Sequence, residues 1–133
     1  MTRWGERTTQ VLTGGVIAGA AAEFAVLECF LLPLRIGSVA APLSIPAAAL
    51  GNVGLPALAY RLTGSRALAS LPVIVWVAVV ALASLPRPEG DLIVAGTWRG
   101  VAFLLVGAVA GAYAVGRLLG APRKRDIGGD SGR

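Results

Sequence analysis

Histidine is absent from this sequence, and cysteine is nearly absent. The 133 residues include no His and a single Cys, Cys29. A structural zinc site needs about four nitrogen or sulfur ligands, so such a site is excluded and no metal is expected. A disulfide within the chain is impossible, and no Ser/His or Cys/His pair exists for nucleophilic catalysis. There is also no glycine loop of the P-loop kind. We therefore predict a protein that is not an enzyme and holds no cofactor.

Charged residues are also scarce, while apolar residues come in long blocks. The charged fraction is 14%, against roughly 25% in soluble domains, and the hydrophobic fraction is 56%. Both features indicate an integral membrane protein, with the lipid bilayer as its surroundings. The net charge of +5 would suggest a nucleic-acid ligand in a soluble protein. Here the cations lie at the ends of the apolar blocks, so membrane topology and anionic lipid explain them, and no nucleic-acid partner is expected.

Four apolar blocks each have about the ~20 residues needed to cross a bilayer. They cover residues 11–34, 37–60, 67–85 and 98–119. The backbone of a span must satisfy its own hydrogen bonds in lipid, so the blocks should be helices, and short connections make neighbours antiparallel. The predicted fold is an all-α integral membrane protein, an antiparallel four-helix transmembrane bundle over residues 11–119. Ser65 and Thr97 are the expected N-caps of the third and fourth helices.

The alternative for the first block is a secretory signal peptide cleaved near residues 38–42. The apolar core of a signal peptide has ~7–15 residues. This block is longer and carries two glutamates, which favours a transmembrane helix.

The distribution of cations predicts the orientation. Nine lie on one side of the predicted bundle and three on the other. The first group is Arg3, Arg7, Arg61, Arg66, Arg117, Arg123, Lys124, Arg125 and Arg133; the second is Arg35, Arg87 and Arg99. Because cytoplasmic loops are rich in Lys and Arg, both termini should be cytoplasmic, in a multi-pass protein of the plasma (inner) membrane. Residues 1–10 form the N-terminal segment, and residues 120–133 form a basic, disordered tail that binds anionic lipid.

The first block contains two acids, Glu23 and Glu28. A carboxylate in mid-membrane costs ~2.5–3.5 kcal/mol, and such residues rarely face lipid. Gly15, Gly19 and Glu23 follow one another at four-residue steps, so they form a stripe that another helix can approach closely. We therefore expect Glu23 to face protein. Glu28 lies ~140° further around the helix, where it aligns with Arg35.

The second block is the natural partner of the first. Its prolines and glycines predict a broken helix whose freed backbone groups are satisfied by protein or by a wet cavity. Ser44 and Asn52 are candidate hydrogen-bond partners of the two acids. Glu23, Glu28, Ser44 and Asn52 therefore form the candidate intramembrane polar site.

Three interpretations of Glu23 stay open. It is a proton or cation site, a hydrogen-bonding brace between helices, or a contact with a basic group on another protein. In the fourth block, Gly107 and Gly111 have the spacing of a close helix contact. We favour packing within the bundle over a homodimer for these two glycines.

The architecture resembles the small multidrug resistance exporters, which have four short spans, an essential glutamate in the first one, and a dimeric arrangement. This resemblance implies that Glu23 is that glutamate and that Gly107 and Gly111 lie at the dimer face. The second acid, the proline-rich second block and the loop PRPEGD depart from that family's pattern.

Two stretches resemble a family of small actinobacterial four-span membrane proteins that is known as a domain of unknown function. They are GNVGLPALAYRLTGSR (51–66) and LPRPEGDLIVAGTWRG (85–100). The resemblance covers Leu34 to Leu119 and implies the four-span architecture without an activity.

The leading functional hypothesis is a non-enzymatic accessory or interaction subunit that packs against itself or within a larger membrane complex. The alternative is a small proton-coupled transporter that works as a homodimer with Glu23 as the proton or substrate site. A helical scaffold whose acids only brace the bundle is the third hypothesis.

Overall fold

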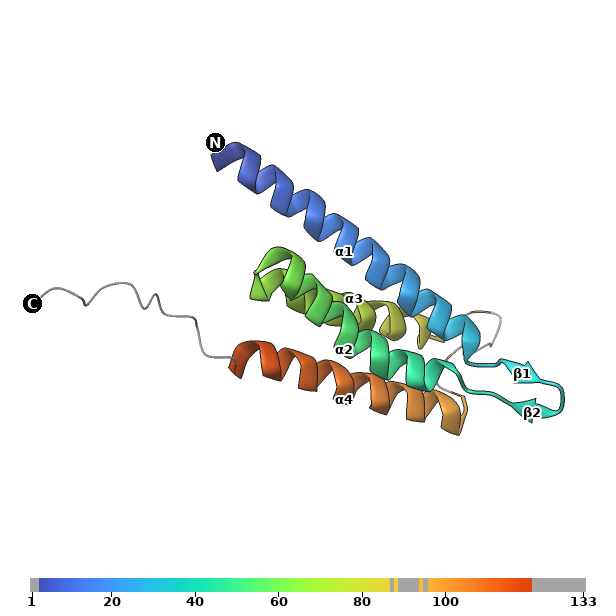
Figure 1. The fold of residues 1–133 in the computed structure, drawn as a ribbon. Coiled ribbons are helices and arrows are strands. Elements are labelled where there is room, and N and C mark those ends of the chain that lie inside the picture. The colour runs from blue at the N-terminus through green and yellow to red at the C-terminus, as the bar shows by residue number, and fades with distance from the viewer. Residues whose placement is uncertain (1–2, 87, 89–93, 95, 121–133) are drawn as a thin grey trace, which may run out of the picture.

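The computed structural model describes residues 3–86, 88, 94 and 96–120, and this part of the chain is helical apart from one small hairpin. The helices are α1 (Arg3–Leu31), α2 (Ser44–Thr63), α3 (Arg66–Ala83) and α4 (Trp98–Gly120). Consecutive helices run in opposite directions, so the start of α1, the α2–α3 turn and the end of α4 share one end of the bundle (Figure 1). The basic tail predicted at residues 120–133 lies outside the described residues, apart from its first residue.

Three of these helices, α1, α3 and α4, are long and apolar enough to cross a membrane. Together they carry three of the four predicted spans, so the chain has the character of a membrane protein. Helix α2 does not meet this criterion, because Asn52, Arg61 and several glycines and prolines interrupt its alanines and leucines.

Helix α1 is longer than the first apolar block. It begins at Arg3 instead of residue 11 and ends at Leu31 instead of residue 34. Most of the predicted N-terminal segment is therefore helical. The end follows from Pro33, because a proline disfavours the α conformation of the residue before it.

The second apolar block is not helical throughout, which corrects the predicted boundary at residue 37. Strands β1 (Arg35–Ile36) and β2 (Val39–Ala40) form an antiparallel hairpin, in which Arg35 pairs with Ala40 and Ile36 with Val39. Gly37 has a φ of 63° in the two-residue turn, a conformation that glycine adopts without strain. The hairpin projects from the end of the bundle opposite the N-terminus (Figure 1).

The predicted helix caps are present. The Ser65 side chain accepts a hydrogen bond from the Leu68 N–H at 3.4 Å, and Thr97 Oγ1 accepts one from the Gly100 N–H at 3.3 Å. Gly64, with a φ of 64°, ends α2 and donates its N–H to the Tyr60 carbonyl at 2.8 Å. Two capped ends separated by only two residues hold α2 and α3 as a tight antiparallel pair.

Helices α2 and α3 form the centre of the bundle. They pack against each other, and each also contacts both α1 and α4. Among the described residues, no Cα atom of α1 lies within 8 Å of a Cα atom of α4. The buried core combines side chains from all four helices, from the turn after α1 and from the loop before α4: Ala25, Cys29, Leu32, Ala48, Trp76, Val80, Val94 and Phe103. Because α1 lies at one side of the bundle, much of its circumference stays uncovered.

Candidate functional site

Glu28 is the acid that the fold buries. It lies with Ala25 and Cys29 on the face of α1 that packs into the core, just before the buried Leu32, and only 1% of its surface is exposed. The Trp76 indole N–H of α3 donates a hydrogen bond to Glu28 Oε2 at 2.7 Å. Within the described part of the chain, Glu28 Oε1 has no hydrogen-bond partner. The carboxyl group is thus held by a single neutral donor in an otherwise apolar core.

Arg35 does not pair with Glu28, contrary to the expectation from their spacing. Residue 35 lies beyond the end of α1, so the two residues do not share a helix face. The Arg35 guanidinium instead donates to the Ser38 carbonyl at 3.2 Å, inside the hairpin. The partner of Glu28 therefore comes from α3.

Trp76 joins three helices at this point. Its ring lies 5.5 Å from the ring of Phe103 in α4, measured between centroids, while its N–H bonds to α1. Its six-membered ring lies against Gly107, where a methyl group would overlap it. Gly111 lies similarly close to Val73 of α3. Gly107 and Gly111 therefore pack against α3 within the chain, and neither belongs to an exposed face.

Ser44 and Asn52 are buried on α2, but they do not bind the acids. Ser44 is 0% and Asn52 3% exposed, and Ala48 lies between them on the same helix face. No hydrogen bond joins either residue to a glutamate in the described residues, and Ser44 Oγ and Asn52 Nδ2 have no partner there. The predicted polar site is consequently divided, with Glu28 bonded to α3 and the two α2 side chains separate from it.

Glu23 is exposed, so the expectation that it faces protein is not met by α2 or by any other described helix of the chain. Two residues along a helix correspond to ~200°, so the turn that buries Ala25 directs Glu23 to the opposite side. Gly15 and Gly19 are exposed on the same stripe, and a methyl group on either glycine would meet open space. Gly15, Gly19 and Glu23 thus form one uncovered face of α1, which we call the α1 stripe.

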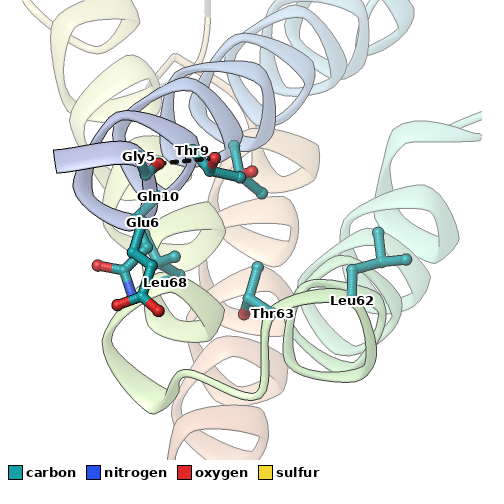
Figure 2. Close-up of a pocket in the computed structure, with 8 residues that line it drawn as sticks. Gly5, Glu6, Thr9, Gln10, Leu62, Thr63 and Leu68 are labelled. Atoms are coloured by element: carbon teal, nitrogen blue, oxygen red, sulfur yellow. Dashed lines mark hydrogen bonds between the residues drawn. The ribbon is translucent and has the colours of Figure 1, made fainter. Parts of the chain in front are cut away.

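A pocket that the sequence did not indicate lies between the first turns of α1 and the α2–α3 turn. Its volume is about 580 Å³, and Glu6, Thr9 and Gln10 of α1 lie across it from Leu62 and Thr63 of α2 (Figure 2). The Thr9 and Thr63 hydroxyls donate to carbonyls of their own helices, at 2.9 and 2.7 Å. The pocket exists because α1 continues beyond the predicted start of the span, and it contains none of the predicted site residues.

Comparisons with protein-family models, with curated proteins and with solved structures find no match to this chain. The functional argument therefore depends on the geometry alone, and above all on the α1 stripe.

Proposed function

We propose that this chain is a four-span protein of the plasma (inner) membrane that serves as a non-enzymatic interaction subunit. The fourth span is α2, which packs against the three apolar helices and is joined to α3 by two residues. Its 20 residues correspond to ~30 Å, the thickness of the hydrocarbon core. Its outward face is apolar, with Leu50, Leu58 and Leu62 all exposed. These features support placing α2 at the same membrane depth as its neighbours.

The charge at the two ends of the bundle supports cytoplasmic termini. Among the described arginines, Arg7, Arg61, Arg66 and Arg117 lie toward the end that holds the start of α1 and the end of α4. The opposite end has Arg35 and Arg99. The excess of cations at the first end favours its position on the cytoplasmic side.

The α1 stripe carries the proposal that the protein interacts with another membrane helix. In an isolated chain, the Glu23 carboxylate would face hydrocarbon near the middle of a span, which costs ~2.5–3.5 kcal/mol of insertion free energy. A second helix lying on Gly15 and Gly19 could approach closely and offer a hydrogen-bond donor to Glu23. Close packing and a satisfied acid together would stabilise the association. A second copy of the chain and a different membrane subunit are the two forms of this proposal.

The mass of the native particle tests the proposal. The tagged full chain is extracted from its own membranes in mild detergent, and the complex and its polypeptides are weighed. We expect a complex in the wild type and its loss in the double variant Gly15→Leu/Gly19→Leu and in Glu23→Leu. Gly54→Leu is the matched control, because Gly54 is an exposed glycine of α2 with open space around it. A wild-type chain that is monomeric and alone contradicts the proposal.

The exposed position of Glu23 also supports the alternative, a proton-coupled transporter. In a symmetric dimer that uses the α1 stripe, two copies of Glu23 would lie near the two-fold axis, where they could exchange a proton with a substrate. In this case Glu23→Gln should keep the dimer but abolish proton flux in reconstituted vesicles. Equal flux in wild type and variant would eliminate the transporter and leave the interaction subunit.

A further inference from the structure

A groove with a cationic rim lies between α2 and α4, toward the end where α2 and α4 terminate. Its volume is about 300 Å³, and Arg61 of α2 and Arg117 of α4 both line it. Tyr60 and Tyr113 lie beside these arginines in the same lining. The Arg117 guanidinium is 5.8 Å from the centre of the Tyr113 ring and donates to the Tyr113 hydroxyl at 3.5 Å. None of the described residues in the lining is acidic, so the groove presents two guanidinium groups without a counter-charge.

A second hollow lies along the same two helices and shares Tyr113 with the groove. Its volume is about 530 Å³. It lies closer to the middle of the helices, because Val106 and Val109 precede Tyr113 by one to two turns of α4 and Ala49 lies well before Tyr60 in α2. Its lining is almost wholly apolar, with the tyrosine at one end. The two hollows have Tyr113 in common and lie one after the other along α2 and α4; we call them together the α2–α4 groove, which is cationic at the helix ends and apolar toward the middle of the helices.

We infer that this α2–α4 groove binds an anionic phospholipid, with its phosphate between Arg61 and Arg117 and one acyl chain along Val106, Val109 and Ala49. Guanidinium groups bind phosphate oxygens through paired N–H donors, and the tyrosine hydroxyls suit the headgroup region. Anionic lipids give the cytoplasmic leaflet its negative surface potential, which matches the proposed side of this end. The inference rests on the membrane placement in the proposed function, but it does not require any partner on the α1 stripe.

A phospholipid explains both parts of the groove, whereas a free phosphate explains only the first. A free anion would occupy the arginine pair and leave the hollow beside Ala110 unused. A larger side chain at position 110, which would narrow the apolar hollow, should therefore weaken the binding of a lipid and leave the binding of inorganic phosphate unchanged. This difference separates the two sources of the same phosphate chemistry.

Native mass spectrometry of the full chain in detergent tests the inference with phosphatidylglycerol, phosphatidylcholine and inorganic phosphate as separate probes. We expect preferential binding of phosphatidylglycerol, weakened about fivefold by Arg117→Gln and about 25-fold by Arg61→Gln/Arg117→Gln, from ~1 kcal/mol per cation. Ala110→Leu should weaken phosphatidylglycerol binding while both arginines remain. The control Arg7→Gln removes one exposed cation of α1 at the same end of the bundle and should change nothing.

Equal phosphatidylglycerol binding by the wild type and the double arginine variant would overturn the inference. So would binding of inorganic phosphate with the same dependence on the arginines and no effect of Ala110→Leu. Thermal unfolding shows whether each variant folds. If the double arginine variant does not fold, the single variants Arg61→Gln and Arg117→Gln are compared with the wild type instead. The number of bound lipids per chain is measured separately for each oligomeric state in the spectrum. If the α1 stripe is not an interface, the oligomeric states change, but the number of lipids per chain does not.

Discussion

At the scale of single residues, the Glu28–Trp76 pair is a buried hydrogen bond between two helices of the core. A buried carboxyl group without a hydrogen bond costs ~1–3 kcal/mol, and the indole N–H is the only donor that Glu28 has in the described residues. Trp76→Phe removes this donor and also the outer part of the indole that packs against Gly107, so it should lower the free energy of unfolding by at least about 1–3 kcal/mol. Glu28→Gln keeps an acceptor for the indole and should cost less.

Unfolding in mixed micelles of mild and denaturing detergent measures this free energy. Trp98→Phe is the matched control, because Trp98 is 69% exposed and its loss should have little effect. If Trp76→Phe costs no more than Trp98→Phe, the hydrogen bond does not stabilise the core. A double variant Glu28→Leu/Trp76→Phe should recover part of the loss, because it removes the buried carboxyl together with its donor.

The sequence shows that two acids lie in the first helix but cannot show which one is buried. The segment around them has alanine on every side, at positions 18, 20, 21, 22 and 25, so no single face is marked as the buried one. The glycine stripe through Glu23 indicated a helix contact, and within the chain the buried face is instead the one that carries Ala25 and Glu28. The partner of Glu28 is 48 positions away, a separation at which helix periodicity carries no information.

At the scale of helices, four glycines of α2 and α4 distinguish positions where another helix packs closely from positions where space is open. Gly51 faces the Phe24 ring of α1 and Gly107 faces Trp76, and a methyl group at either position would overlap the ring. Gly107→Ala should therefore lower the free energy of unfolding by about 1–3 kcal/mol through overpacking, and Gly51→Ala should act in the same direction.

The controls for this prediction lie in the same helices. Gly54 of α2 and Gly116 of α4 have open space where a methyl group would go, so Gly54→Ala and Gly116→Ala should be neutral or slightly stabilising. The same detergent titration compares each pair. Similar losses at Gly107 and Gly116 would mean that helix flexibility, and not the contact with Trp76, explains the glycines.

The helices themselves were largely predictable, and their exact partners were not. Long apolar runs mark α1, α3 and α4, and the turn at Gly64 and Ser65 follows from local chemistry. The hairpin at residues 35–40 was missed because its residues continue the apolar run that precedes α2. The spacing of Gly107 and Gly111 indicates that some helix approaches, but only the fold identifies α3 as that helix.

At the scale of the whole molecule, α2 and α3 hold the bundle together while α1 and α4 lie on either side. This order leaves an outward face on each flanking helix, with the α1 stripe on one and the α2–α4 groove beside the other. A partner helix and a bound lipid would therefore use different surfaces. The sequence indicates the stripe itself but not that it lies outside the bundle, nor that α2 and α4 enclose a groove, because the order of helices around a bundle depends on contacts between distant residues.

The proposed four-span topology makes a prediction about access from the two sides of the membrane. In a Cys29→Ala background, which removes the single buried thiol, Ser38→Cys places a thiol in the exposed hairpin and Gly64→Cys places one in the α2–α3 turn. If α2 crosses the bilayer and the termini are cytoplasmic, a membrane-impermeant maleimide should label residue 38 in intact cells. Residue 64 should react only after the membrane is opened.

Each other outcome identifies a different error in the topology. Labelling of residue 64 alone in intact cells would show the opposite orientation. It would refute the proposal that the end of the bundle with more cations is cytoplasmic. Equal labelling of both positions would place the two ends of α2 on one side, so that α2 could not be a span. Because Gly64 needs a positive φ, Ser65→Cys serves as a second probe of the same turn, with a conformation that any residue adopts. Agreement between residues 64 and 65 would ensure that the result reports the side of the membrane and not a distorted turn.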